Sequence, residues 1–264
     1  MPNYLYSPGA NPAGGGDWTP QGPTAVTVGG ITAGTDLGLV PTPIEGTLLS
    51  MFYPYQGPLV SLVLNPVAGT REIGTSIAAP DLTPTTTRRT NNITTLTLSR
   101  SGVGVIHTYA TPNPAGGTEA PYTDVSGAVT ANTTYTATVG DGTSTSTGTG
   151  VYTFLPGIYH GVDTSVITTG GDIVTAFGAS VVLASSRAVT YIFDASVSGG
   201  SNYLYISYPT SFSAPASTLF NGFTFTDYAS STVSLTNASG HTQDYYILRT
   251  NNTYSGASIT WQIL

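Results

Sequence analysis

The stretch that decides the fold is TTYTATVGDG, residues 133–142. Tyr135, Ala137 and Val139 share one face of an extended chain here, and threonines occupy the other face. This period-2 alternation is typical of a half-buried β-strand. The glycines on either side of Asp141 supply a tight turn, so we expect a hairpin at this point.

The same alternation, interrupted by Gly, Pro, Asn and Asp, runs through most of the chain and predicts many short strands. We expect residues 157–163 to form a break between two sets of strands, and residues 251–256 to be the turn of a hairpin between the last two strands. The predicted strands are 59–64, 93–99, 103–111, 133–139 and 149–154 in the first set, and 188–193, 203–208, 222–228, 232–237, 245–250 and 257–263 in the second.

The fold class that follows is all-β, with two β-sandwich domains, Ig-like or jelly-roll-like, behind an extended N-terminal arm. The arm is rich in Pro and Gly and cannot bury a face of its own. Two small sandwiches fit the length of 264 residues. The expected boundaries are 1–30 for the arm, 31–160 for the first sandwich and 161–264 for the second.

One short helix is expected near residues 43–52. Thr42 and Glu45 have the spacing of a capping box at its start. Ile44, Leu48 and Phe52 recur at intervals of four and would face a core together. We therefore expect this helix to plug one end of the first sandwich.

The composition excludes several classes of function. Charged residues make up 7% of the chain, against an average of about 25%, and the six basic residues are all Arg. The only adjacent pair of cations, Arg88 and Arg89, is too little to neutralise a phosphate backbone, so we expect no nucleic-acid partner. The chain has no Cys, which excludes disulfides, thiolate zinc sites and Cys nucleophiles. We find no apolar run long enough for membrane insertion and no secretory signal at the N-terminus.

No catalytic or metal-binding motif is visible. His107, His160 and His241 are far apart, and none has a second ligand at metal-binding spacing. The acids are mostly isolated in turn-like sequence, where Asp satisfies its own backbone. We expect no cofactor, no metal and no enzymatic activity, with one alternative left open: distant acids that converge in the fold could make a glycan depolymerase.

Tyrosines are the remaining candidates for a binding function, because the chain has 17 of them. Tyr combines a rigid apolar face with a polar tip, which suits interfaces and stacking on sugars. Tyr203 and Tyr205 lie on the strand face opposite Leu204 and Ile206, and we expect them to form an exposed ligand-binding pair. The apolar residues of the arm are expected to order against a partner chain and anchor assembly; these are Tyr4, Leu5, Tyr6 and Trp18.

Several segments resemble a module of structural and fibre proteins of environmental bacteriophages. The resemblance extends over residues 28–264 and is carried by turn and core motifs. These are VGGITAGT at 28–35, FYPYQ at 52–56, REIGT at 71–75, the Thr-rich hairpin at 134–154, YHG at 159–161, YLYISYP at 203–209, TNASG at 236–240 and RTNN at 249–252.

This resemblance implies a non-enzymatic virion protein: a fibre, a spike or a head-decorating protein released by host lysis. The expected partners are further copies of the chain, most simply in a homotrimer, other virion proteins through the arm, and host-surface glycans. A cellular surface adhesin is a further alternative, which would need an export signal encoded upstream of Met1.

Overall fold

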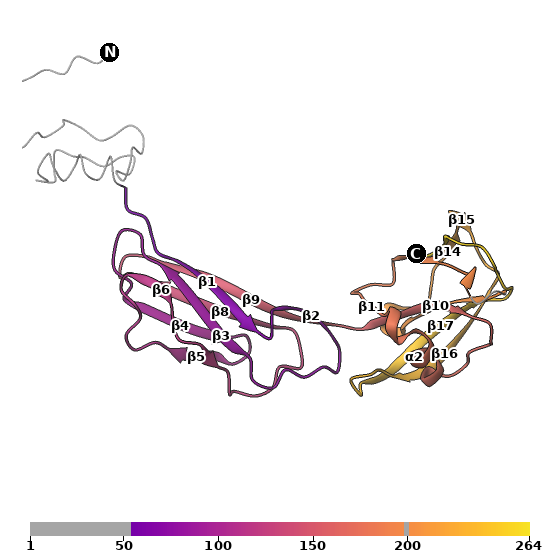
Figure 1. Cartoon of the computed structure of the whole chain (residues 1–264), viewed down its shortest axis with the longest axis horizontal. Coiled ribbons are helices and arrows are strands. Elements are labelled where there is room, and N and C mark those ends of the chain that lie inside the picture. The colour runs from indigo at the N-terminus through magenta and orange to yellow at the C-terminus, as the bar shows by residue number, and fades with distance from the viewer. Residues whose placement is uncertain (1–53, 198–200) are drawn as a thin grey trace, which may run out of the picture.

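The computed structural model describes residues 54–197 and 201–264. The predicted all-β class is confirmed, because strands in several sheets make up about half of these residues and helices only a few. The predicted helix at 43–52 lies outside the described residues, as do the arm and its residues Tyr4, Leu5, Tyr6 and Trp18. Figure 1 shows two β units that follow one another along the long axis of the molecule.

The N-terminal unit is a sandwich of two sheets. Its strands are β1 (Leu59–Asn65), β2 (Gly69–Glu72), β3 (Asp81–Thr87), β4 (Thr95–Arg100), β5 (Gly104–Thr108), β6 (Gly116–Thr118), β7 (Tyr122–Thr123), β8 (Thr133–Gly140) and β9 (Thr145–Leu155). One sheet has the order β1-β3-β6 with β7 also paired to β3, and the other has the order β2-β9-β8-β4-β5. The β8–β9 hairpin is confirmed, with Gly140 opposite Thr145.

The core of this unit follows from the alternation in β8. Tyr135, Ala137 and Val139 are all buried, while the threonines between them are half-buried on the other face. The glycines of β9 let β1 pack directly against it. A Cβ on Gly148 would lie 2.6 Å from the carbonyl oxygen of Val60, so only glycine allows this approach.

The C-terminal unit has three layers. Its elements are β10 (Gly157–Asp163), α2 (Gly170–Phe177), η1 (Gly178–Ser180), β11 (Val182–Leu183), β12 (Thr190–Phe193), β13 (Tyr203–Pro209), η3 (Thr210–Phe212), β14 (Thr218–Phe220), β15 (Phe223–Thr224), β16 (Tyr228–Thr236), β17 (Thr242–Thr250) and β18 (Ile259–Ile263). A sheet with the order β11-β10-β13-β17-β16 lies between α2 on one face and a sheet with the order β12-β18-β14-β15 on the other.

The helix α2 covers part of the central sheet. Thr169 caps it, because its hydroxyl oxygen accepts a hydrogen bond of 3.2 Å from the N–H of Asp172. Ile173 and Phe177, four residues apart, point into the core. Phe177 packs against Gly161, where a Cβ would lie 2.3 Å from Cδ1 of the ring.

Two predictions about the C-terminal unit are wrong. Segment 157–163 is not a break but the strand β10, which pairs with β11 and β13, so the change from one unit to the next falls at Pro156 and not at residue 160. Residues 251–256 are not a hairpin turn, because β17 and β18 belong to different sheets. The segment crosses between the sheets, held by hydrogen bonds from the side-chain amides of Asn251 and Asn252 to Asp227.

The junction between the two units is closed by polar contacts. Asn237 Nδ2 donates a hydrogen bond of 2.7 Å to the carbonyl oxygen of Ile73. Tyr159 Oη donates one of 3.0 Å to Glu72 Oε1. Gly74, with a φ of +95°, fits against His241 so closely that a Cβ would lie 2.6 Å from the Cβ of that residue. These contacts join loops and strands from both units, so the units are not connected by the chain alone.

Candidate functional site

The structure does not show the predicted exposed pair of tyrosines. Tyr203 is half-buried at the start of β13, but Tyr205 has no exposed surface. The alternation suggested one covered face, whereas β13 is the middle strand of the central sheet and is covered on both. Leu204, Ile206 and Tyr208 face the outer sheet, and Tyr205 faces α2.

Tyr205 is a structural residue. Its ring lies 5.5 Å from that of Phe177 in α2. Its hydroxyl donates a hydrogen bond of 2.8 Å to the carbonyl oxygen of Ser165 and accepts one of 2.9 Å from the N–H of Ile167. Burial raises the pKa of this hydroxyl, and the bond from Ile167 offsets part of the rise. Tyr205 thereby fastens segment 165–167 over the sheet and is not available to a ligand.

The accessible side chains lie next to Tyr205. Asp163 in β10 is directly opposite Tyr203 in β13, and Arg249 in β17 is directly opposite Tyr205. The guanidinium carbon of Arg249 lies 5.2 Å from the centre of the Tyr203 ring. Asp163, Tyr203 and Arg249 are each half-buried. We call these three residues the tip cluster.

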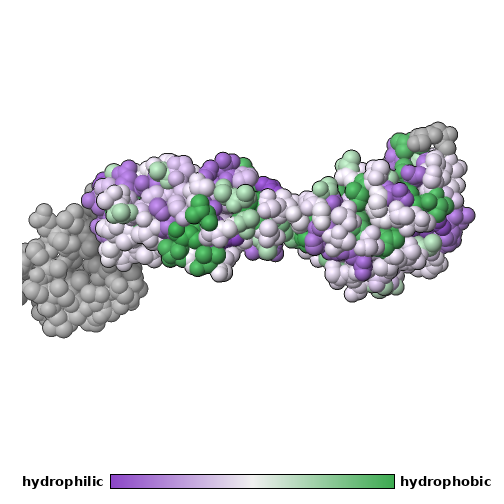
Figure 2. All heavy atoms as spheres, turned by 90° about the horizontal axis from the view of Figure 1, so that it is seen from below, coloured by the Kyte–Doolittle hydropathy of each residue, from purple (hydrophilic) through white to green (hydrophobic). Residues whose placement is uncertain are grey.

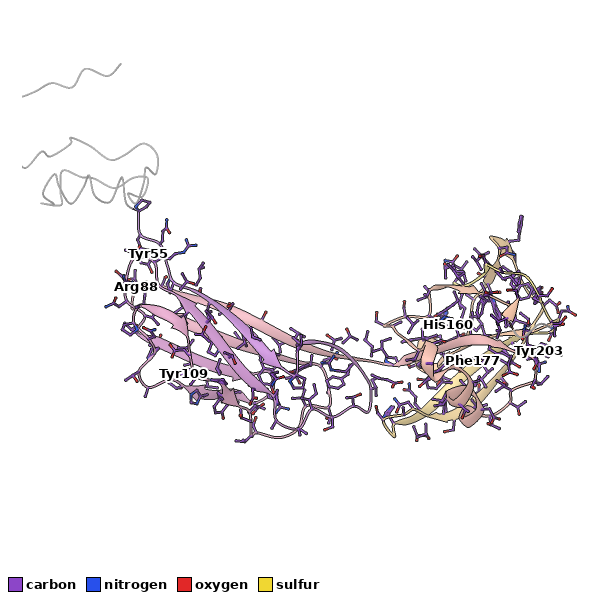
Figure 3. All side chains as sticks on the ribbon, viewed as in Figure 1. Tyr55, Arg88, Tyr109, His160, Phe177 and Tyr203 are labelled. Atoms are coloured by element: carbon purple, nitrogen blue, oxygen red, sulfur yellow. The ribbon has the colours of Figure 1, made fainter. Side chains whose placement is uncertain are left out.

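The tip cluster lies at the end of the sheet remote from the junction. β10 begins at the junction with Gly157 and ends at Asp163, and β13 pairs with it antiparallel, so β13 starts at the remote end with Tyr203. β17 leaves the turn at 237–241 beside the junction and reaches Arg249 near its far end. Figure 3 shows Tyr203 at the outer end of the C-terminal unit, with Tyr55 and Arg88 at the opposite end of the described molecule.

Arg249 differs from the other five arginines. All six are within the described residues, and the other five donate hydrogen bonds to carbonyl, amide or carboxylate oxygens. The side chain of Arg249 makes no hydrogen bond and no ion pair in the described part of the chain, and its Nε atom is buried without an acceptor. Its guanidinium instead lies against the face of the Tyr203 ring.

A second polar cluster lies in the N-terminal unit and has a structural role. Arg100 Nη1 and Asp124 Oδ2 are 3.1 Å apart, with side chains 11% and 0% exposed. Tyr135 Oη donates a hydrogen bond of 2.6 Å to the same carboxylate oxygen. Burial alone would raise the pKa of Asp124, but the bonds from Ser126 and Tyr135 and the charge of Arg100 together hold it below its ordinary value. Every group has a partner, so this network leaves nothing for a substrate.

The histidines and acids do not form a metal site. His107 stacks on Tyr122 at 4.3 Å between ring centroids. His160 lies in β10, within the segment that was expected to be a break between two sets of strands, and burial lowers its pKa. Among residues 54–197 and 201–264, no three His, Asp or Glu side chains come close enough together to hold a metal ion. No helix in that part of the chain is long and apolar enough to cross a membrane.

Sequence reasoning missed Asp163 and Arg249. Asp163 was assigned to turn-like sequence, and Arg249 was noted only as part of a motif. Their proximity depends on the order of β10, β13 and β17, which local alternation does not give. Comparisons with protein-family models, curated proteins and solved structures found no match.

Proposed function

We propose that the chain is a non-enzymatic structural protein of a bacteriophage particle, in a fibre, a spike or a head decoration, and that it is exposed on the outside of the virion. The observation that carries this proposal is the closed junction between two β units arranged end to end (Figure 1). A protein that projects from a particle needs such a fixed spacer, because a flexible linker alone would not hold one unit in line with the next.

The surface composition supports the same proposal. Figure 2 shows a face covered mostly by residues of intermediate hydropathy, with scattered hydrophilic and hydrophobic residues among them. This agrees with a charged fraction of 7% and with the abundance of Thr, Ser and Gly in the exposed strands. Few charged groups would have to lose their water where neighbouring copies pack together, even though each copy has a formal net charge of −7.

The edge of the N-terminal sandwich supports association between copies. β5 pairs with β4 on one side only, among the described strands. Val103 and Val105, 53% and 65% exposed, lie at this edge, and no charge or proline between residues 103 and 108 blocks it. A strand edge with exposed apolar side chains can pair with another chain, although β5 is short and its register with β4 is interrupted between Leu98 and Ser99. We propose a homo-oligomer, with a trimer as the expected state and the arm contacting other virion proteins.

The test of the proposed function is the composition of purified particles. Mass spectrometry of density-purified virions should identify the chain in stoichiometric amounts, and immunogold labelling should place it on the particle surface. A chain found only in the soluble lysate of infected cells, with labelled virions at background, would overturn the proposal. A chain in the envelope of uninfected cells would favour the adhesin.

The oligomeric state has its own test. Light scattering coupled to gel filtration should give a mass that is a multiple of 27.1 kDa. A monomer at micromolar concentration would contradict self-association. Substituting Val105 by Lys should shift the mass to that of the monomer if β5 is the contact, whereas Val182→Lys, at an exposed residue of the C-terminal unit, should leave the mass unchanged.

A further inference from the structure

We propose that the tip cluster, Asp163, Tyr203 and Arg249, is a binding site for a sugar that bears a carboxylate. The proposal rests on the proposed function, because it gives the outward end of a projecting protein a ligand on the surface that the particle meets. The class of ligand is inferred from the hydrogen-bonding groups of the cluster that have no partner in the described structure.

Arg249 selects the anionic group. A guanidinium has five N–H donors in a planar fork that matches a carboxylate with two parallel hydrogen bonds. None of these donors has an acceptor in the described structure, and Nε is already removed from solvent. Nη1 and Nη2 are not buried in this way, so they are the pair of donors that a carboxylate can reach.

Tyr203 positions the guanidinium. The guanidinium carbon of Arg249 lies 5.2 Å from the centre of the Tyr203 ring. This contact restricts the rotation of the long arginine side chain before any ligand binds. An aromatic face stabilises a guanidinium without occupying the donor edge, so the fork stays available. The side chain is therefore arranged in advance, which lowers the entropy lost on binding.

Asp163 provides acceptors for hydroxyls. Its Oδ1 accepts a hydrogen bond of 2.7 Å from the N–H of Ser165, and its Oδ2 accepts none. β10 and β17 flank β13, and Arg249 is offset from Asp163 by two residues along the strands, so their Cα atoms lie roughly 12 Å apart. A single sugar ring with a carboxylate at one end and hydroxyls at the other spans such a distance. A bare anion would reach Arg249 alone, and Asp163 would repel it.

The test is a titration of the full chain with methyl β-D-glucuronide, in which binding is monitored by saturation-transfer NMR. The matched neutral ligand is methyl β-D-glucoside, and sodium acetate and N-acetylglutamate test a carboxylate without a sugar. We expect the glucuronide to bind at least about tenfold more tightly than the other three ligands, which is ~1.4 kcal/mol. Equal binding of the glucoside would overturn the role of Arg249, and equal binding of N-acetylglutamate would assign the site to acidic peptides instead.

Variants test the named residues. Arg249→Gln should reduce glucuronide affinity by about tenfold or more, and Arg249→Lys should reduce it less. Asp163→Asn should weaken the glucuronide, because a hydroxyl acceptor is lost, and strengthen acetate, because the repulsion of a bare anion is removed. Arg89→Gln is the matched control, because Arg89 is an exposed arginine in the other unit whose Nη1 donates only to Gln56. Unchanged affinity in Arg249→Gln, or equal losses in Arg249→Gln and Arg89→Gln, would overturn the proposal.

Two further measurements are needed. Melting temperatures distinguish a loss of binding from a loss of folding, and particle incorporation distinguishes failure of the tip site from failure of the proposed virion function. Melting temperatures identify a variant that fails to fold. If Arg249→Gln fails to fold, the test of the site relies on Asp163→Asn, because Asp163 lies half-buried at the end of β10. Binding is measured on the isolated chain and particle incorporation on virions. Failure to bind sugar with normal incorporation rejects only the tip site, whereas binding by a chain absent from virions rejects only the virion function.

Discussion

Tyr159 and Glu72 are joined by a hydrogen bond of 3.0 Å that crosses from one β unit to the other. Tyr159 belongs to β10 and is 2% exposed, and Glu72 is the last residue of β2. Burial and the neighbouring Glu72 carboxylate raise the pKa of the Tyr159 hydroxyl well above its ordinary value. The hydroxyl is therefore protonated and donates to Glu72 at any physiological pH.

Replacing Tyr159 by Phe should loosen this junction. The lost bond to a charged acceptor should lower the free energy of unfolding by about 1–3 kcal/mol. Spin labels on single introduced cysteines, one in each unit, should show a broader distance distribution, and the absence of native Cys makes such labelling specific.

Tyr122→Phe is the control for that measurement. Tyr122 also carries a hydroxyl on a half-buried ring, but it lies in the N-terminal unit and stacks on His107. Its removal should leave the distance distribution unchanged. Identical distributions for Tyr159→Phe and the unmodified chain would show that the bond to Glu72 does not restrain the units.

Alanine substitutions at Gly161 and Gly171 should change the free energy of unfolding in opposite directions. A Cβ at Gly161 would lie 2.3 Å from the ring of Phe177, so Gly161→Ala should displace α2 and destabilise by about 1–3 kcal/mol. Gly171 lies within α2 with nothing closer than 4.0 Å to its added Cβ, so Gly171→Ala should stabilise by about 0.5–1 kcal/mol. Urea denaturation measures both, and equal signs would contradict the packing of α2 against β10.

The strands that the sequence predicts well are those with one covered face. In β18, Ile259, Trp261 and Ile263 are buried and the residues between them are half-buried, as the alternation indicates. β13 is covered on both faces, and a period-2 pattern cannot then show which side faces solvent. The prediction for Tyr205 was wrong for this reason.

Other elements were missed because their local signals conflict or depend on distant contacts. β3 carries Pro84 within a central strand, and proline normally argues against such a strand. Thr169 and Asp172 have the spacing of a helix cap, but α2 has only 8 residues and little periodicity to detect. The tip cluster needs the order of three strands, which only tertiary contacts supply.

Stability should depend on pH through Asp124. Its pKa is lowered in the folded protein, so its contribution is present above the unfolded pKa of about 3.9 and is lost as the pH falls through the lower folded value. Asp124→Asn removes this dependence and leaves Arg100 without its counter-charge, which should cost about 3–5 kcal/mol at pH 7.

Urea midpoints between pH 7 and pH 2 measure this dependence. The unmodified chain should lose stability more steeply than Asp124→Asn in the acid range, and the two curves should converge there. A variant with the same acid slope as the unmodified chain would show that other carboxylates account for the effect. Asp227→Asn is the comparison, because Asp227 is an acid bonded to the exposed Asn251 and Asn252 and has no arginine partner.

Asn237 allows the turn at the junction to be separated from the contact that it makes. Its Oδ1 accepts hydrogen bonds from the N–H groups of Ser239 and His241, at 3.0 Å and 2.9 Å, and its Nδ2 donates to Ile73 across the junction. Asn237→Asp keeps the acceptors and so keeps the turn. It replaces the donor by a charged oxygen that faces the carbonyl of Ile73, so this contact becomes repulsive.

Asn237→Asp should therefore broaden the distance distribution between the units while the C-terminal unit keeps its own fold. The matched control is Asn113→Asp, because Asn113 also accepts from a backbone N–H and donates to a carbonyl, here that of Gly116, but entirely within the N-terminal unit. Asn237→Asp should lose about 1–3 kcal/mol, since it leaves a partly buried carbonyl without its donor. Asn113→Asp should lose less, because Asn113 is exposed and water can replace the lost donor. Only Asn237→Asp should alter the relative arrangement of the units, and the same broadening in Asn113→Asp would show that the change is not specific to the junction.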